Sequence, residues 1–491
     1  MVVFAFVFCV SMAYSFECFA SVKILIFSLI GVLLFVLCYK LLALLSERYK
    51  TLFNGFLVVF FLCFVFVTLF LNLTCRNNSY SIIDYGFVLD AAVEYAEIGE
   101  KFDSSYFSNF TVNAFLMLVL SGIIRFCRLI HIQDYYYVLA VIATLIESVT
   151  MLSCAFLAYK EKEKIHDAAM AMIAFACFLP MYALMPFLYN DMLTFSIITV
   201  VFSIIRMAYD TDKKWAYYLL NCLAGLVLGF GILIKFTIVI QVIALGIVLF
   251  IYRKPKKKLG IFVMMLVTCG TLLVGNAYVN SKEFVKIHSL TENPVSAWIA
   301  TGMSEDGSFS AAYYNNFIKE MYTYETKEEK DAYSKEYIKN NYKVLFDFSH
   351  IIKKTKRAYG LSTFGASEYS IEAEAGYEDN LIVKCFNVYR GGYPVVLDIV
   401  SSYFGSILVI YILGIAYGIY LQIKNKQRPL LLEIAEISFV GYFLYLMISE
   451  TSHHQIFNLM PLVILGTVLH INLLTENTEQ GFKFGLKKFS L

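Results

Sequence analysis

The sequence has little charge for its length. Of its 491 residues only 16% are Asp, Glu, Lys or Arg, whereas 59% are hydrophobic and 17% are aromatic. A soluble fold does not need that much apolar surface, so this composition excludes one. The mean hydropathy of +0.67 and the repeated apolar runs predict an all-α polytopic membrane protein, inserted in the cell membrane by many passes. The near-zero formal charge of +2 argues against a nucleic-acid partner.

Other features are missing too. The sequence contains no Cys/His spacing typical of a metal site, so no metal-binding residues are predicted. It contains no internal repeat, which weakens the case for an inverted-repeat transporter. No basic residue precedes the first apolar run, 2–14, which we interpret as a short first span rather than a signal peptide. Most of the 11 cysteines lie inside apolar runs, and only Cys18, Cys75 and Cys385 lie near outer segments, so at most one disulfide is expected.

Apolar segments long enough to cross a bilayer predict, together with the run 2–14, roughly 11–13 transmembrane helices. They lie near 21–45, 52–74, 110–127, 135–158, 168–188, 192–208, 216–234, 238–252, 261–280, 395–422, 430–449 and 456–474. The chain then divides into a transmembrane region, 1–280, with a first outer loop at 75–109, an extracytoplasmic loop or lid at 281–393, and C-terminal helices with a cytoplasmic tail at 394–491.

Basic clusters set the predicted sides of the membrane, because Lys and Arg are enriched in cytoplasmic loops. Arg125 with Arg128, the run Lys160–Lys164, and Arg206 with its neighbours are all expected on the cytoplasmic side. Only one apolar run separates Arg128 from Lys160–Lys164, and this breaks the alternation. Segment 135–158 is therefore predicted to be a re-entrant or broken helix, with its central Glu147 buried in protein rather than in lipid.

The first polar interval, 81–113, carries the chemistry that we expect. From Asp84 onward, apolar residues recur with helical spacing, which predicts an amphipathic helix on the membrane surface with Asp84 and Asp90 at its start. A carboxylate held at the interface suits a general base that acts on a lipid-anchored substrate. The alternative is that Asp84 is only the N-cap of this helix.

Short motifs follow in order along the predicted outer segments. The early ones are Asp84 in IIDYGFVLDAA, the turn Phe110-Thr111-Val112-Asn113, the prolines Pro180 and Pro186 before Tyr189-Asn190-Asp191, and the turn Ile234-Lys235-Phe236-Thr237. The later ones are WIATGMSEDG (Trp298–Gly307), Lys354 and Tyr359 in KTKRAYGLSTF, and Glu450 with His454 and Pro461.

In these motifs the chain resembles the membrane glycosyltransferases of the GT-C superfamily, in particular the family-39-like enzymes of Gram-positive bacteria (protein O-mannosyltransferase or aminoarabinose-transferase-like). Four departures stand out: Thr111 and Phe236 replace prolines, Gly302-Met303 has the Gly–Met order where the family has Met–Gly, and His454 replaces an arginine. The resemblance implies a GT-C-like bundle with interfacial helices in the first outer loop and a longer outer loop near the C-terminal third. It also implies a polyprenyl-phosphate-linked sugar donor and transfer with inversion.

The resemblance assigns roles to particular residues. Asp84 would be the catalytic base, with Asp90 as the second candidate, and the substrate-binding residues would be Asn113, Asp191, Lys235, Lys354, Glu450 and His454. No cofactor is expected. Some relatives with this fold use a divalent metal, whereas the family-39-like group is not expected to need one. The sugar and its acceptor, whether lipid, wall polymer or protein, stay open, and membrane lipids are the other expected partners.

Each assignment has a simpler alternative. Asp191 could be a helix N-cap, Lys235 a snorkelling lysine, and Lys354 a residue attracted to anionic lipid. Glu450 and His454 could simply sit at the headgroup level. At the level of function, the alternative is a flippase or transporter of a polyprenyl-linked or amphipathic envelope precursor. That class should carry charged residues deep in several spans, where Glu147 is nearly the only one expected. A structural scaffold is a third alternative.

Overall fold

The computed structural model describes residues 21–74, 84–99, 102, 104–252, 255–360, 362–368, 381–424 and 429–488. This part of the chain is helical and contains no strand. The N-terminal region comprises α3 (Val22–Arg48), α4 (Lys50–Thr74), α5 (Asp84–Ile98), α6 (Ala114–Leu129), α7 (Tyr136–Lys162), α8 (Ile165–Ala176), α9 (Leu179–Leu184), α10 (Asn190–Leu193), α11 (Ile197–Asp210), α12 (Lys214–Ile234), α13 (Ile238–Tyr252) and α14 (Pro255–Asn280).

The outer region comprises α15 (Glu283–His288), α16 (Val295–Thr301), α17 (Phe309–Tyr314), α18 (Phe317–Met321), α19 (Lys327–Asn341), α20 (Phe348–Tyr359) and α22 (Leu381–Phe386). The last helices are α23 (Tyr393–Ile423), α24 (Leu430–Ile448) and α25 (Met460–Lys488). Short 3₁₀ turns include η2 (Ser105–Ser108), η3 (Thr111–Asn113), η4 (Tyr342–Phe346) and η6 (His453–Leu459). The predicted all-α polytopic membrane fold is confirmed.

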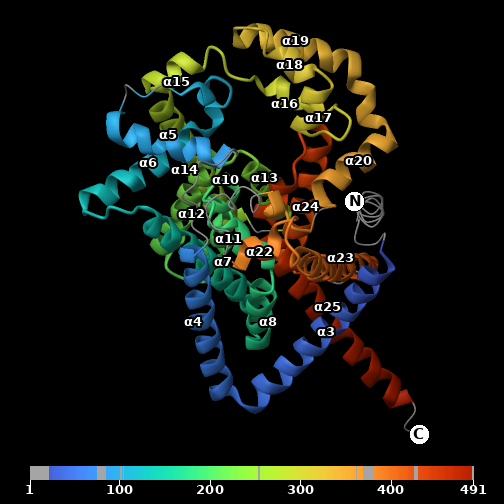
Figure 1. Cartoon of the computed structure of the whole chain (residues 1–491). Coiled ribbons are helices and arrows are strands. Elements are labelled where there is room, and N and C mark those ends of the chain that lie inside the picture. The colour runs from blue at the N-terminus through green and yellow to red at the C-terminus, as the bar shows by residue number, and fades with distance from the viewer. Residues whose placement is uncertain are drawn as a thin grey trace.

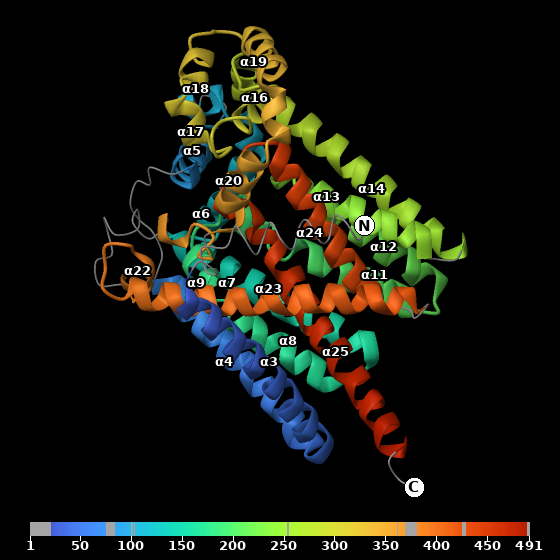
Figure 2. The same cartoon turned by 90° about the vertical axis from the view of Figure 1, so that its right-hand side faces the viewer.

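Ten helical segments of the described chain are long and apolar enough to span a membrane. Two shorter apolar helices, Ile165–Ala176 and Ile238–Val248, add to them. Figures 1 and 2 show that α5 and α16–α19 gather at one end of the bundle, opposite the turn between α3 and α4 and the C-terminus. We call the end that carries α5 the outer end.

Helix α6 does not cross the bundle as predicted but lies beside α5. The two helices start close together, because the Tyr189 hydroxyl is hydrogen-bonded both to Asp84, which begins α5, and to Asn113, which precedes α6. Their last turns are joined by an ion pair between Glu97 and Arg128, 2.8 Å apart. Arg125 also donates to the backbone of Tyr95 in α5, at 2.7 Å. The prediction that Arg125 and Arg128 share a side with Lys160–Lys164 is therefore wrong.

The prediction of a re-entrant or broken segment at 135–158 is also wrong. Helix α7 is continuous from Tyr136 to Lys162. The sequence suggested a break because α6 was counted as a transmembrane span. Since α6 lies along α5 at the outer end, α7 can cross the bundle from one end to the other without a break. Glu147 in α7 is fully buried and accepts a hydrogen bond from Asn72 of α4 at 2.8 Å, so its predicted burial in protein is confirmed.

The break occurs one segment later instead. The predicted span 168–188 is divided into α8 and α9, with Pro180 near the start of α9 and Pro186 beyond its end. Proline lacks the backbone N–H that a continuing helix would need, so the helix stops and restarts there. The irregular chain after α9 leads directly to Tyr189 and Asp191 at the outer end.

The predicted lid is a small folded layer. Helix α19 begins with a capping box in which Thr326 and Glu329 satisfy each other's backbone N–H groups. The layer has its own apolar core, formed by Ala297, Ala300, Ala312, Phe317, Ile318 and Met321. Of the three cysteines considered for a disulfide, Cys385 is free. Cys18, Cys75 and the apolar run 2–14 lie outside the described residues.

Candidate functional site

Asp84 lies among hydroxyl groups from other segments. It is the first residue of α5, its side chain is exposed, and its Oδ2 accepts a hydrogen bond from the Tyr189 hydroxyl at 3.3 Å. Tyr106 is a second hydrogen-bond partner. The residue as a whole is exposed, but the protein around its carboxyl group partly desolvates that group and so raises the pKa of Asp84, while the two tyrosines act in the opposite direction. The carboxylate is thus held in place by side chains from beyond its own helix.

Asn113 positions these tyrosines rather than contacting Asp84 itself. Its Nδ2 donates to the hydroxyl of Tyr106 at 2.7 Å and to that of Tyr189 at 3.1 Å. The side chain of Asn113 makes no cap bond to α6. Asp90 is an exposed residue further along α5. Partial desolvation by the neighbouring protein raises the pKa of its carboxyl, and its charge acts on Tyr85 and Tyr135. The structure does not place Asp90 among the tyrosines around Asp84.

Asp191 is joined to the tyrosine cluster through its own short helix, because Tyr189 precedes it by two residues. Its carboxylate is buried and forms an ion pair with Lys235. The other oxygen of Asp191 lies 4.0 Å from Nε2 of His454. The two simpler interpretations are therefore wrong: Asp191 lies inside α10 rather than capping it, and Lys235 turns inward to a carboxylate instead of snorkelling to the interface.

Glu450 brings a second carboxylate toward Asp84. It follows α24 in the loop before η6, and its backbone N–H donates to the Trp298 carbonyl at 2.9 Å. Burial and the negative charge of Asp84 raise the pKa of Glu450 to about 7, although Arg357 and Lys354 act in the opposite direction. Two carboxyl groups that influence each other in this way are typical of a site with divided acid and base roles.

Lys354 is fully buried rather than available to a substrate or to lipid. Its ammonium donates to the backbone carbonyls of Gly302 at 2.8 Å, Met447 at 3.0 Å and Ser449 at 2.7 Å. Burial lowers the pKa of Lys354 to about 7. A Cβ at Gly307, whose φ is +75°, would lie 2.6 Å from its side chain. Lys354 therefore fastens α20 to the end of α24, and both roles expected for it are wrong.

Arg357 is the cation that sequence reasoning did not single out. It is half-buried, and its charge acts on Glu450, His453 and His454. Its Nε is buried without a hydrogen-bond partner in the described chain. His350, Lys354 and Arg357 follow each other by four and three residues, which puts them on one face of α20. This helical spacing was the available signal.

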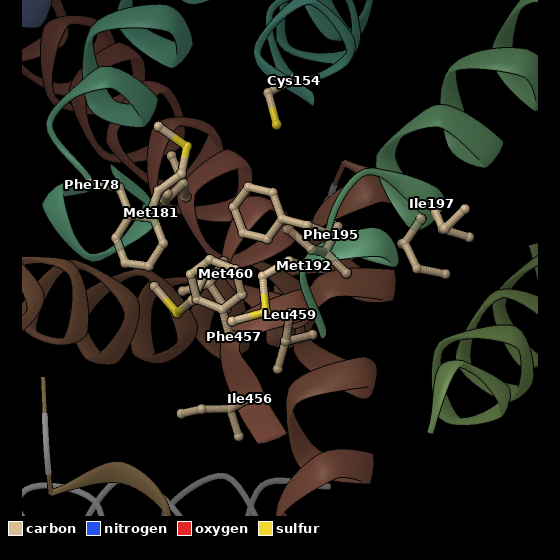
Figure 3. Close-up of a cluster of buried hydrophobic side chains, with 14 of the residues drawn as sticks. Cys154, Phe178, Met181, Met192, Phe195, Ile197, Ile456, Phe457, Leu459 and Met460 are labelled. Atoms are coloured by element: carbon tan, nitrogen blue, oxygen red, sulfur yellow. The ribbon is translucent and has the colours of Figure 1, made fainter. Parts of the chain in front are cut away.

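A dense aromatic core holds the two turns of the site together. Phe195, just after Asp191, stacks on Phe457 of η6 with ring centres 4.6 Å apart, and Phe178 packs against both. Figure 3 shows these three rings facing one another, with Met192 and Met460 beside them. Because buried interiors are packed closely and deform little, this core fixes the position of Asp191 relative to His454.

Ionisable residues buried in the apolar helices are more numerous than predicted. Besides Glu147, His470 of α25 is fully buried 3.6 Å from Glu436 of α24, and Asp167 is fully buried in α8. The expectation that Glu147 is nearly the only such residue is therefore wrong. In the described residues, no group of three or more His, Cys, Asp or Glu side chains is arranged to hold a metal ion.

Comparison with known proteins gives a family and no activity. No curated protein matches the chain. The sequence profile of one family, described as conserved hypothetical integral membrane protein, matches residues 19–473, which includes every helix of the site. The match and the apolar helices together establish a multi-pass membrane protein. The chain belongs to this family of conserved hypothetical integral membrane proteins.

Proposed function

We propose that this protein is a glycosyltransferase that moves a sugar from a polyprenyl-phosphate-linked donor to an acceptor hydroxyl at the outer end of the bundle. The observation that carries the proposal is the convergence on Asp84. An exposed carboxylate, ordered by two tyrosines, lies close enough to Glu450 for their charges to interact, and Arg357 acts on the same Glu450. A base and a cation within one polar cluster match the needs of displacing a phosphate by a hydroxyl.

The chemistry assigns each group a step. The carboxylate of Asp84 takes the proton of the acceptor hydroxyl as that oxygen attacks the anomeric carbon. The bond from the anomeric carbon to the phosphate oxygen breaks, and its electron pair leaves with the polyprenyl phosphate. Arg357 is the cation whose open Nε can bind that phosphate as its charge grows. With one base and no covalent intermediate, the product has the inverted configuration.

The pair of Asp191 and Lys235 has a supporting role in this mechanism. Since the Lys235 ammonium is already paired with a carboxylate, its charge is largely neutralised toward a phosphate. The pair instead fixes the turn after α12 against α10. Tyr189 directly precedes α10, so the pair also helps to position the hydroxyl that donates to Asp84. His454, with Nδ1 2.9 Å from Ser452 Oγ, extends the same polar cluster toward Arg357.

A second candidate function is a flippase or transporter of a polyprenyl-linked or amphipathic envelope precursor. The observation that favours it is the set of ionisable residues buried in the spans, above all the pair of Glu436 and His470. Intramembrane ionisable residues often line ion or proton pathways. A transporter would depend on that pair, whereas an enzyme would depend on Asp84.

The test is a membrane assay with a panel of radiolabelled polyprenyl-phosphate sugars. We expect the wild-type chain to transfer label from one of them and Asp84→Asn to lose about 100-fold to 10,000-fold in rate, as for loss of a general base. Glu436→Gln is the matched comparison, and it should keep transfer if it still folds. Transfer of label that is equal in wild type and Asp84→Asn would sink the proposal.

A further inference from the structure

A row of four aromatic rings runs beside the two carboxylates of the site. Phe87 stacks on Tyr106 with ring centres 5.5 Å apart and planes 11° apart, and Tyr106 stacks on Phe110 at 5.0 Å. Phe110 then meets Trp298 of the lid at 6.0 Å. The row starts three residues from Asp84 and ends at the residue whose carbonyl accepts from Glu450. It therefore spans the distance between the first outer loop and the lid.

Phe87 is the open end of this row. Tyr106 covers one of its faces, yet the side chain is 47% exposed, so much of the rest of the ring faces outward. One exposed phenylalanine on a surface needs no explanation. Here, however, the ring is fixed in orientation by a stacked partner whose hydroxyl is itself held by Asn113 at 2.7 Å. A fixed, open aromatic face is a preformed binding surface.

The surroundings of Phe87 decide what would bind there. Asp84 and Asp90 stand three residues before and after it, so helical spacing places both carboxylates beside the ring on the exposed side of α5. Glu94 and Glu97 continue that exposed side. Four acidic groups make insertion of this surface into lipid costly, since charged side chains are expensive in a bilayer. An apolar ring flanked by hydrogen-bond acceptors instead matches a sugar, which has an apolar C–H face and a rim of hydroxyl donors.

We propose that Phe87, with Asp84 and Asp90 on either side, is a carbohydrate-binding platform and that the acceptor is accordingly a glycan. A sugar ring stacks on Phe87, and its hydroxyls donate to the two carboxylates. The acceptor hydroxyl at the reacting end then lies at Asp84. This inference rests on the proposed function for the role of acceptor, but the binding itself can be measured without any transfer. It also gives Asp90 a role in binding rather than in catalysis.

The experiment measures saccharide binding to the full-length protein in nanodiscs. Saturation-transfer NMR is recorded with trisaccharides of glucose, mannose and N-acetylglucosamine, without donor lipid. We expect one of them to bind saturably, and Phe87→Ala to weaken its affinity about 3-fold to 12-fold, the range of one aromatic contact. Phe87→Tyr keeps a ring and should bind as wild type does. Phe346→Ala removes an aromatic ring that is 80% exposed on the lid and should change nothing.

Two further outcomes separate the explanations. Phe87→Trp in a background of Trp215→Phe and Trp298→Phe carries a single tryptophan, because the chain has two. Strong quenching of its emission by phospholipids with brominated chains would place the ring in lipid and overturn the platform. Equal saccharide binding by wild type and Phe87→Ala, or binding of none, overturns it as well. Loss of transfer in Asp84→Asn supports the enzyme, whereas unchanged transfer in that variant removes only the proposed function and leaves the saccharide-binding result of Phe87→Ala to decide the platform.

Discussion

Two clusters of buried charge, at opposite ends of the bundle, differ in whether they are complete. At the inner end, both oxygens of Asp167 accept hydrogen bonds, from Tyr39 of α3 at 2.8 Å and from Asn472 of α25 at 2.7 Å. Lys162 in turn donates to Asn472 at 2.7 Å. This network closes on itself, since each of these groups has its partner within the fold.

The outer cluster leaves groups open. Asp191 Oδ2, Asn190 Oδ1 and Arg357 Nε are buried without a hydrogen-bond partner in the described part of the chain. Buried polar atoms in folded proteins nearly always find partners, so a group of open ones indicates bound water or a ligand. The comparison teaches that buried charge alone does not mark a site. The inner cluster ties helices together, whereas the outer cluster has bonding capacity left for another molecule.

The sharpest way to break this comparison is to exchange the two aspartates for asparagine. Asp84→Asn should abolish nearly all transfer, by about 100-fold or more, and leave thermal unfolding in detergent within about one degree. Asp167→Asn should do the reverse, with a lowered unfolding temperature and transfer close to wild type in the folded fraction. Both are checked by label transfer and by scanning fluorimetry on the same preparations. A stability loss in Asp84→Asn equal to that in Asp167→Asn would erase the distinction.

Lys354, the buried lysine of the lid, tests whether a cation near the site can have a structural role alone. Lys354→Met leaves three carbonyls without their donor and should destabilise the lid by about 3 kcal/mol. Lys353→Met is the matched control, because Lys353 is exposed and its ion pair is with the exposed Glu305. Limited proteolysis of 281–393 reports the difference. Equal cleavage rates for the two variants would show that the carbonyl contacts do not hold the lid.

Arg357 separates ligand binding from stability within the outer cluster. Arg357→Gln removes the cation proposed for the donor phosphate and should raise KM for the donor about 10-fold to 100-fold. Arg357→Lys should recover part of that loss, because the charge returns without the planar fork. Arg128→Gln breaks an exposed pair with Glu97 and serves as the control with unchanged KM. If the KM for the donor is the same in Arg357→Gln as in wild type, the donor phosphate binds elsewhere.

The smallest effect is expected from the pH dependence of Glu450. Its pKa is raised from 4.5 to about 7 in the fold, so its protonated form is favoured by folding. The contribution of Glu450 to the free energy of unfolding is therefore complete below pH 4.5 and is lost as the pH rises through about 7. Wild type should therefore unfold at a temperature about one to three degrees lower at pH 8 than at pH 5 on account of this group. Glu450→Gln should reduce that difference, and an identical pH profile for the two would contradict the shift.

How much could be predicted depended on how local the signal was. The helix from Asp84 and the burial of Glu147 follow from spacing and composition within a short window, and they were predicted. The turns carrying Asp191, Lys235 and His454 were predicted to share the outer end, and the structure brings them into contact. The path of α6 was not predictable in this way, because an apolar helix of its length can cross a membrane or lie along another helix.

The sequence by itself determined that the chain is a multi-pass helical membrane protein and which polar turns lie between its spans. Both follow from free energies that each segment has alone, the transfer of apolar side chains out of water and the cost of charge in lipid. Only the tertiary structure decided which cations donate all their hydrogen bonds to groups within the fold and which keep a donor without a partner. Lys354 and Arg357 lie three residues apart in one basic run, yet one meets three carbonyls and the other has an open Nε. That difference depends on partners more than 50 residues away, to which no local pattern refers.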